Sequence, residues 1–228
     1  MVNINYILFI LPAFILSLIC QFRVKSTYAK YDKVLNARRI TGAHAAQRVL
    51  NYGSVLDVSV NSIKGTLTDH YDPRTNCINL SNAVYTNASI ASVGIAAHEA
   101  GHAIQHSVGY TPIKWRTALV PICNLGSSIA PWLIMLGLFL NMAGLYFVGL
   151  IAFSTVALFQ LVTLPVEFNA SRRALEALES SGVLSDDELK GAKKVLSAAA
   201  MTYVAALAMS FMQILYYVSL FNGNRNRR

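Results

Sequence analysis

The sequence has 228 residues, of which 54% are hydrophobic and only 13% are charged, and its mean hydropathy is +0.44. A chain of this length makes one domain or two, but the composition excludes an ordinary soluble domain, because its apolar blocks reach the roughly 20 residues that cross a bilayer. The net charge of +8 indicates membrane orientation and contact with anionic lipids, and we expect no nucleic-acid partner.

The first apolar block, residues 1–22, contains no charged residue. A cleaved signal peptide has a basic start and a small-residue cleavage site, and neither is visible here. We therefore predict an uncleaved transmembrane anchor, helical over residues 4–22.

The next segment, residues 23–116, predicts a small α+β part. Residues 28–53 show helical spacing and end at Gly53, which indicates an amphipathic helix lying on the lipid surface. The runs SVLDVSV, GTLTDHY and NCINLS are rich in β-branched residues and DPRT is a turn signature, so we expect a short antiparallel sheet of three strands. Between Asn87 and Gly109 the spacing is helical again.

The second half of the chain alternates apolar and charged segments. Residues 117–166 contain no Asp, Glu, Lys or Arg and have LNMAG near their middle, which predicts a transmembrane hairpin. Residues 167–194 predict a helical segment in which SDDE is a capping box. Residues 195–228 predict a last transmembrane helix followed by the basic tail NGNRNRR.

The positions of Lys and Arg predict the orientation. Segment 23–116 holds eleven of the nineteen basic residues and segment 167–194 holds five, so the positive-inside rule places both at the cytoplasmic side. Four spans would put the three arginines of the tail outside, against the same rule, so the side of the tail stays open. The predicted class is a mainly α, multi-pass cell-membrane protein with about four transmembrane helices and a small cytoplasmic α+β part.

Residues 94–106, GIAAHEAGHAIQH, carry the main chemical signal. On a helix, His98 and His102 share one face and can bring two imidazole nitrogens to a zinc ion about 2.0–2.1 Å away. Glu99 lies beside that face and can accept a proton from a metal-activated water, as in the H-E-x-x-H zinc peptidases. The alternative is two capping or interfacial histidines without a metal. Gly101 costs the helix about 1 kcal/mol relative to Ala, which close approach of another backbone or of substrate would explain.

A third ligand must come from elsewhere in the chain. His106 lies two turns from His98, which favours a surface role or a role behind a ligand. Glu167 is the first charge after fifty uncharged residues and stands at the end of a predicted span, where an acidic residue is a candidate functional group. The alternative for Glu167 is a carboxylate favoured by the dipole of its helix.

The segments HEAGHAIQH and LPVEFNASRRAL, separated by two predicted spans, together with DHYDP, resemble the YugP-type membrane zinc metallopeptidases, a bacterial family. The resemblance covers essentially the whole chain. It implies a zincin-like catalytic part of the gluzincin kind, with one Zn²⁺ per chain held by His98, His102 and Glu167, and with Glu99 as the catalytic residue.

The layout is also similar to the HtpX and CAAX-type membrane metalloproteases, in which an acidic residue shortly after the ligand glutamate supports a ligand histidine. Here Asn169 or Ser171 stands in that region. Gluzincins commonly bind substrate as an added strand, for which NCINLS is the candidate edge. The candidates for stabilising an oxyanion are His70, Tyr71, Tyr85, Arg172 and Arg173.

We therefore expect a zinc-dependent endopeptidase acting on membrane-associated or misfolded proteins at the cytoplasmic face, with protein or peptide substrates and the lipid bilayer as partners. One alternative is a site-2-type intramembrane protease, which the polar run NLSNAVYTNAS before the motif disfavours. Another is a non-catalytic membrane protein with a structural zinc, but such sites use four ligands, often cysteines, and Cys77 is the one cysteine of the predicted soluble segments. The oligomeric state stays open.

Overall fold

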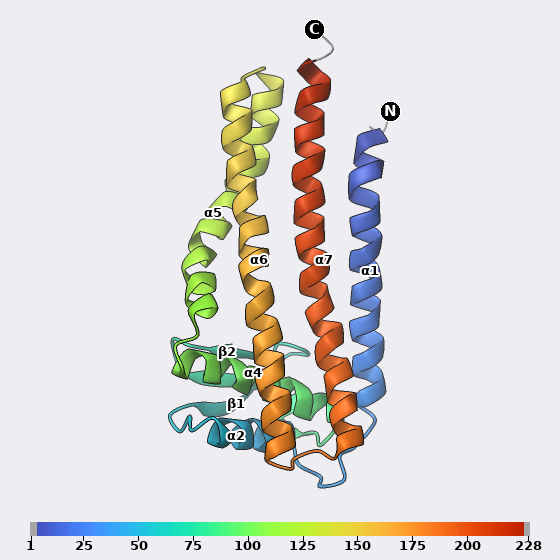
Figure 1. The fold of residues 1–228 in the computed structure, drawn as a ribbon, viewed down its shortest axis with the longest axis vertical. Helices are drawn as coiled ribbons and strands as arrows, with labels where there is room; N and C mark the ends of the chain where they lie inside the picture. Colours follow the sequence, from blue (N-terminus) through green and yellow to red (C-terminus); the bar gives the residue numbers. More distant parts are fainter. Residues whose placement is uncertain (1–3, 226–228) are drawn as a thin grey trace. The chain divides into compact units, whose positions relative to one another are not determined.

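The computed structural model describes residues 4–225 as seven helices and three strands (Figure 1). Residues 226–228, the end of the predicted basic tail, lie outside the described residues, as do residues 1–3. In chain order the elements are α1 (Ile4–Tyr31), α2 (Gly42–Tyr52), β1 (Ser59–Ile63), β2 (His70–Asp72), β3 (Cys77–Ser81), α3 (Asn82–Thr86), α4 (Ile90–Ser107), α5 (Thr111–Phe139), α6 (Ala143–Ser180) and α7 (Asp186–Arg225).

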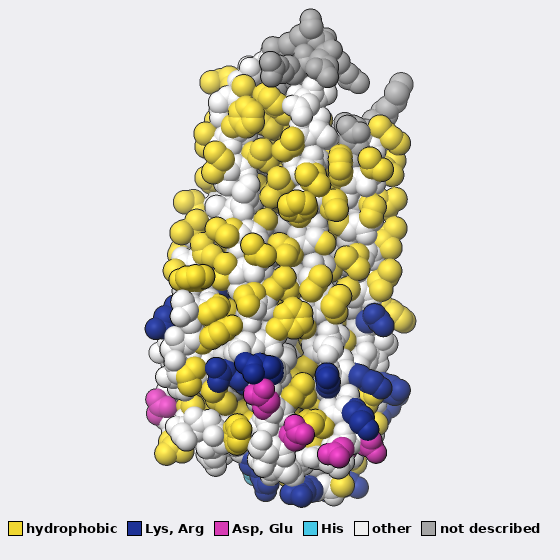
Figure 2. All heavy atoms as spheres, in the orientation of Figure 1, with side chains coloured by type: hydrophobic (Ala, Val, Ile, Leu, Met, Phe, Trp, Pro, Cys, Tyr) yellow, Lys and Arg dark blue, Asp and Glu magenta, His cyan; other side chains and the backbone are white. Residues whose placement is uncertain are grey.

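These elements form two compact units. The helical unit comprises residues 1–21, 114–165 and 201–228, and the motif unit comprises residues 22–113 and 166–200. The helical unit contains parts of α1, α5, α6 and α7, and these four helices are long and apolar enough to cross a membrane. Figure 2 shows hydrophobic side chains along the visible face of this unit. The four predicted apolar helices are therefore confirmed, and α5 and α6 are separated at residues 140–142, inside LNMAG.

Two contacts connect the helices of the helical unit: a close backbone approach between α5 and α6, and a hydrogen bond from the Tyr146 hydroxyl of α6 to α7. A Cβ atom on Gly137 of α5 would lie 2.6 Å from the backbone nitrogen of Tyr146 in α6, so only glycine fits there. Tyr146 is fully buried, and its hydroxyl donates a hydrogen bond of 2.5 Å to the carbonyl of Tyr217 in α7. This bond satisfies a polar group where no water competes for it.

The motif unit contains a three-stranded sheet in the order β1-β3-β2. Strand β3 pairs parallel with β1 and antiparallel with β2, so the predicted antiparallel sheet is wrong in one of its two pairings. The reason is burial: Ile78 and Leu80 of β3 are fully buried, and this strand takes the centre, between two strands that contain no buried residue. The prediction that NCINLS is a free substrate edge is also wrong, because both sides of β3 are paired.

The predicted amphipathic helix over residues 28–53 is interrupted. Residues 28–31 belong to α1, whereas α2 begins at Gly42 after an irregular segment. The buried side chain of Asn36 stabilises that segment, since its Nδ2 donates to the carbonyls of Ile40 and Ala88 over 2.8 and 2.6 Å and its Oδ1 accepts from the amide of Ile40. The helix ends at the predicted Gly53 cap. Its apolar face is buried inside the motif unit instead of lying on lipid.

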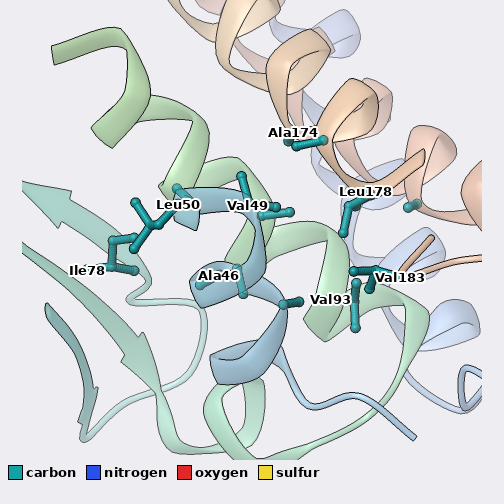
Figure 3. Close-up of a cluster of buried hydrophobic side chains, with 14 of the residues drawn as sticks. Ala46, Val49, Leu50, Ile78, Val93, Ala174, Leu178 and Val183 are labelled. Carbon is teal, nitrogen blue, oxygen red and sulfur yellow. The ribbon is translucent and has the colours of Figure 1, made fainter. Parts of the chain in front are cut away.

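Helix α4 lies in the hydrophobic core of the motif unit. Figure 3 shows core side chains from α2, β3, α4, α6 and the segment between α6 and α7, labelled Ala46, Val49, Leu50, Ile78, Val93, Ala174, Leu178 and Val183. Alanines 96, 97 and 100 of α4 are fully buried, so its neighbours approach closely. Burying a Val or Leu side chain stabilises a fold by about 1.5–3 kcal/mol, and this core therefore fixes the helix that carries the histidines.

The start of α7 has one of the two hydrogen bonds of the predicted capping box. The amide and the hydroxyl of Ser185 donate to Oε2 of Glu188 over 2.8 and 3.0 Å. Oε1 of Glu188 accepts a further hydrogen bond of 2.7 Å from the amide of Ala37. One carboxylate thus starts the helix and also anchors the segment that precedes α2.

Candidate metal centre

Helix α4 presents His98 and His102 on one face, as their spacing predicts. The ring centroids lie 4.7 Å apart and the rings meet edge to face. Ser89 caps the helix by accepting a 3.0 Å hydrogen bond from the amide of Ser92. His98 is half-buried and His102 is buried, so both rings are held by their surroundings.

Helix α6 brings a carboxylate to the two rings. Oε2 of Glu167 lies 3.2 Å from Nε2 of His98 and 3.7 Å from Nε2 of His102, and the three donor atoms lie within 4.8 Å of one another. A tetrahedral zinc ion with bonds of about 2.0–2.1 Å holds neighbouring donors about 3.3–3.5 Å apart. Two nitrogens and one carboxylate at these separations fit such an ion.

The approach of α6 to α4 explains the glycine in the motif. A Cβ atom on Gly101 would lie 2.5 Å from the carbonyl oxygen of Ala170, three residues after Glu167. Real Cβ atoms do not approach a backbone oxygen this closely, so the residue must be glycine. The prediction that Gly101 admits another backbone is confirmed.

The second nitrogen of each imidazole also has a partner. Nδ1 of His98 lies 3.1 Å from the hydroxyl of Ser171, and Nδ1 of His102 lies 3.0 Å from Oε1 of Gln105. Of the two residues expected behind the histidines, Ser171 contacts a ring directly. Asn169 instead accepts hydrogen bonds from the amide of Gln105 and from Nε of Arg173, over 3.0 and 2.8 Å.

Gln105 is a residue that sequence reasoning missed. Its side chain is completely buried and its Nε2 donates a 2.8 Å hydrogen bond to the carbonyl of Val166. The available signal was an amide three residues after His102, on a helix otherwise rich in alanine. Such an amide has no motif of its own, and only the tertiary structure shows that it is buried against α6.

The histidines and the carboxylate of the cluster shift each other's pKa values toward their charged forms. Burial alone would lower the pKa of His102, but the adjacent carboxylate of Glu167 and the charge of Glu99 outweigh burial and raise it. Burial would raise the pKa of Glu167, but the adjacent imidazoles of His102 and His98 hold it well below its usual range. The carboxylate is thus ionised and stabilised by positive charge, which a metal cation also supplies.

Glu99 lies beside the cluster and not in it. It is buried, and its Oε2 accepts a 3.0 Å hydrogen bond from the backbone amide of Tyr71 in β2. Strand β2 is an edge of the sheet, and an extended chain can pair with such an edge. The arrangement therefore combines a candidate cation site, an oriented carboxylate and an edge strand next to that carboxylate.

The remaining predicted residues lie outside the three-residue cluster. Exposed His70 contacts the Thr68 carbonyl through Nδ1, and the Tyr71 hydroxyl donates to Asn76. The ring of His106 packs on that of Tyr71 with centroids 5.4 Å apart. Other candidates from the sequence have different neighbours: Arg172 pairs with Glu176, Arg173 binds Asn169, and Tyr85 lines an open cavity beside α2.

Comparison with known proteins shows the family to which the sequence belongs. Residues 6–222 match the family described as "Putative neutral zinc metallopeptidase". The chain is also similar to "Putative membrane protease YugP" of Bacillus subtilis (strain 168), with 43% identity over 221 residues that cover 97% of this chain and 98% of that protein. No solved structure gives a significant match. The resemblance to the YugP-type family is therefore confirmed.

Proposed function

This chain belongs to the neutral zinc metallopeptidase family, and we propose that it is a membrane-embedded endopeptidase that hydrolyses peptide bonds with one zinc ion per chain. The observation that carries this proposal is the convergence of His98, His102 and Glu167, whose donor atoms lie within 4.8 Å of one another. These three residues hold the ion, and Glu99 transfers protons.

The donor set suits a catalytic ion better than a structural one. Catalytic zinc sites have three protein ligands and an open position, whereas structural sites have four. Among the residues that the structure describes, the cluster contains three donor residues, two histidines and one glutamate. A zinc ion bound there would lower the pKa of a water to about 7 and would polarise a carbonyl oxygen.

Glu99 has the geometry of a general base. The amide of Tyr71 holds its Oε2, which leaves Oε1 to accept a proton from the attacking water. The same oxygen then delivers that proton to the nitrogen of the leaving amine. Because the carboxylate is buried and fixed before reaction, it needs no reorganisation when charge moves.

Strand β2 is the edge that we propose for substrate binding. Its Tyr71 contacts Glu99, so a peptide paired with this edge would pass close to the general base. Backbone pairing gives affinity with little dependence on side chains, which suits membrane-associated or misfolded protein substrates. We place residues 23–116 and 167–194 at the cytoplasmic face, with 1–22, 117–166 and 195–228 forming the membrane part, because the basic residues gather in the first two segments.

The test compares zinc content and casein cleavage for detergent-purified wild type, Glu99→Gln and Glu167→Ala. We expect about one zinc per chain in the wild type, retention of zinc without cleavage in Glu99→Gln, and loss of both in Glu167→Ala. Glu176→Gln is the matched control, because Glu176 also lies on α6 but is exposed and paired with Arg172. A wild type without zinc, or a Glu99→Gln variant that cleaves normally, would overturn the proposal.

A further inference from the structure

We propose that Gln105 is a positioning residue that fixes His102 in the tautomer whose Nε2 binds the metal. The inference rests on the proposed function, since it concerns the same site. Gln105 follows His102 by three residues on α4, and no part of its side chain reaches solvent. Its side-chain amide lies between the imidazole of His102 and the backbone carbonyl of Val166, the residue before Glu167 on α6.

The orientation of the Gln105 amide follows from its neighbours. Its nitrogen lies 2.8 Å from the carbonyl oxygen of Val166 and 3.0 Å from Oδ1 of Asn169. A backbone carbonyl can only accept, so the group that faces Val166 must be the NH₂. Reversing the amide would place two oxygens against each other in a buried site and leave both without a donor.

The acceptor on Asn169 is fixed in the same way. Its Oδ1 lies 2.8 Å from Nε of Arg173, a group that can only donate. Asn169 therefore presents its oxygen to both Arg173 and Gln105. Two independent acceptors, one from the backbone and one from a side chain, hold the NH₂ of Gln105 toward α6 and leave its oxygen toward His102.

This orientation determines where the proton of neutral His102 lies. Oε1 of Gln105 is 3.0 Å from Nδ1 of His102 and can only accept, so Nδ1 must carry the hydrogen. A neutral imidazole has one N–H, which leaves the lone pair on Nε2. Nε2 faces Oε2 of Glu167 at 3.7 Å, so the lone pair points into the cluster.

His98 is not fixed in this way. Its Nδ1 lies 3.1 Å from the hydroxyl of Ser171, and a hydroxyl can donate or accept. The tautomer of His98 can therefore adjust when a metal binds, whereas His102 is set beforehand. Gln105 also connects α4 to the peptide group before Glu167, so one side chain positions two of the three proposed ligands.

A pair of variants separates this role from simple packing. Gln105→Met and Gln105→Glu keep a similar shape, but only Glu retains an oxygen that accepts from Nδ1 of His102. We expect zinc affinity, measured by competition with a chelator in detergent, to fall about 10–100-fold in Gln105→Met. In Gln105→Glu the second oxygen faces the carbonyl oxygen of Val166 and must carry a proton there, while the other oxygen still accepts from Nδ1 of His102. We therefore expect its loss of zinc affinity to be smaller than that of Gln105→Met. If Met had wild-type affinity, or if Glu bound no more tightly than Met, the inference would be wrong.

The tautomer itself is measured without metal. In ¹⁵N-histidine-labelled protein at alkaline pH, with His102 assigned from His102→Asn, we expect the proton on Nδ1 in the wild type and a shift toward Nε2–H in Gln105→Met. A wild-type proton on Nε2 would overturn the inference even if both variants failed to fold. Because this readout needs no zinc, it also separates failure here from failure of the proposed function, which a wild type without zinc would signal.

Two further variants complete the design. Asn169→Ala removes one of the two acceptors that orient Gln105, so its loss of zinc affinity should be smaller than that of Gln105→Met. Gln47→Met is the control, because Gln47 is an exposed helical glutamine bonded to Asn51. A loss of zinc affinity in Gln47→Met as large as in Gln105→Met would contradict a specific role for Gln105.

Discussion

The backbone amide of Tyr71 donates a 3.0 Å hydrogen bond to Oε2 of Glu99. Residues of an antiparallel pair alternate between those bonded to the partner strand and those whose amides point away from it. The amide of Tyr71 therefore points away from β3 and toward Glu99 of α4. The edge strand thus uses its own backbone to orient the carboxylate that we assign as the general base.

Removing this amide should slow cleavage with little loss of zinc. Tyr71→Pro and Tyr71→Ala both lack the phenol ring, but only proline lacks the N–H, and an outward-facing edge position tolerates proline. A hydrogen bond to a charged group contributes about 1.5–3 kcal/mol, so we expect kcat for casein to be about tenfold or more lower in Tyr71→Pro than in Tyr71→Ala. Equal kcat values would show that the amide does not serve catalysis.

The contact between α4 and α6 predicts a sharp difference between two glycines of α4. A Cβ atom on Gly101 would lie 2.5 Å from the carbonyl oxygen of Ala170, whereas one on Gly94 would lie 3.5 Å from the Cβ of Ala192, an ordinary contact. Gly101→Ala should therefore destabilise the protein by about 1–3 kcal/mol, as overpacking does. Gly94→Ala should be neutral or stabilising by up to about 1 kcal/mol, because alanine favours a helix. Thermal unfolding in detergent compares the two variants, and an equal loss in both would contradict this account.

The candidate site could be predicted from sequence where its chemistry is local. The four-residue spacing places His98 and His102 on one helical face without any tertiary information. Glu167 was a candidate because it is the first charge after fifty uncharged residues. The structure brings its Oε2 to 3.2 Å from His98, although the two residues are 69 positions apart.

Features that depend on tertiary contacts were not predictable in the same way. The sheet was expected to be antiparallel from the turn signature DPRT, which does join the antiparallel pair β2 and β3, yet β3 also pairs parallel with β1. The alternation of Ile78 and Leu80 in β3 was a usable signal for a central strand. The role of Asn36 in interrupting a predicted helix depends on the carbonyl of Ala88, fifty-two residues away, which no local pattern contains.

The carboxylate of Glu188 predicts a pH-dependent contribution to stability. Burial would raise its pKa, but hydrogen bonds from Ser185 and Ala37 and the charge of Arg38 lower it. A carboxyl whose pKa is lower in the folded state stabilises the fold above the ordinary pKa of glutamate, about 4.3, and this contribution is lost as the pH falls through the folded value.

The variant Glu188→Gln keeps only one acceptor oxygen for three donors. We expect it to lower the free energy of unfolding by about 0.5–2 kcal/mol at neutral pH, as loss of a helix cap does. The difference from the wild type should shrink on acidification below about pH 4. Urea unfolding at both pH values measures this, and Glu179→Gln, an exposed position in the last turn of α6, is the control. A difference that is constant with pH would rule out the carboxylate as its source.

The five histidines provide a direct test of the proposed ligand set. His98 and His102 direct Nε2 toward Glu167, whereas exposed His70 contacts the Thr68 carbonyl, His106 packs on the ring of Tyr71, and His44 lies exposed on α2. Replacing each histidine singly by Asn should therefore abolish stoichiometric zinc binding at positions 98 and 102 and leave it intact at the other three. Zinc content after gel filtration, with unfolding of each metal-free variant as the measure of folding, distinguishes the two groups. Loss of zinc in a folded His106→Asn or His70→Asn variant would mean that the ion takes a ligand outside the three-residue cluster.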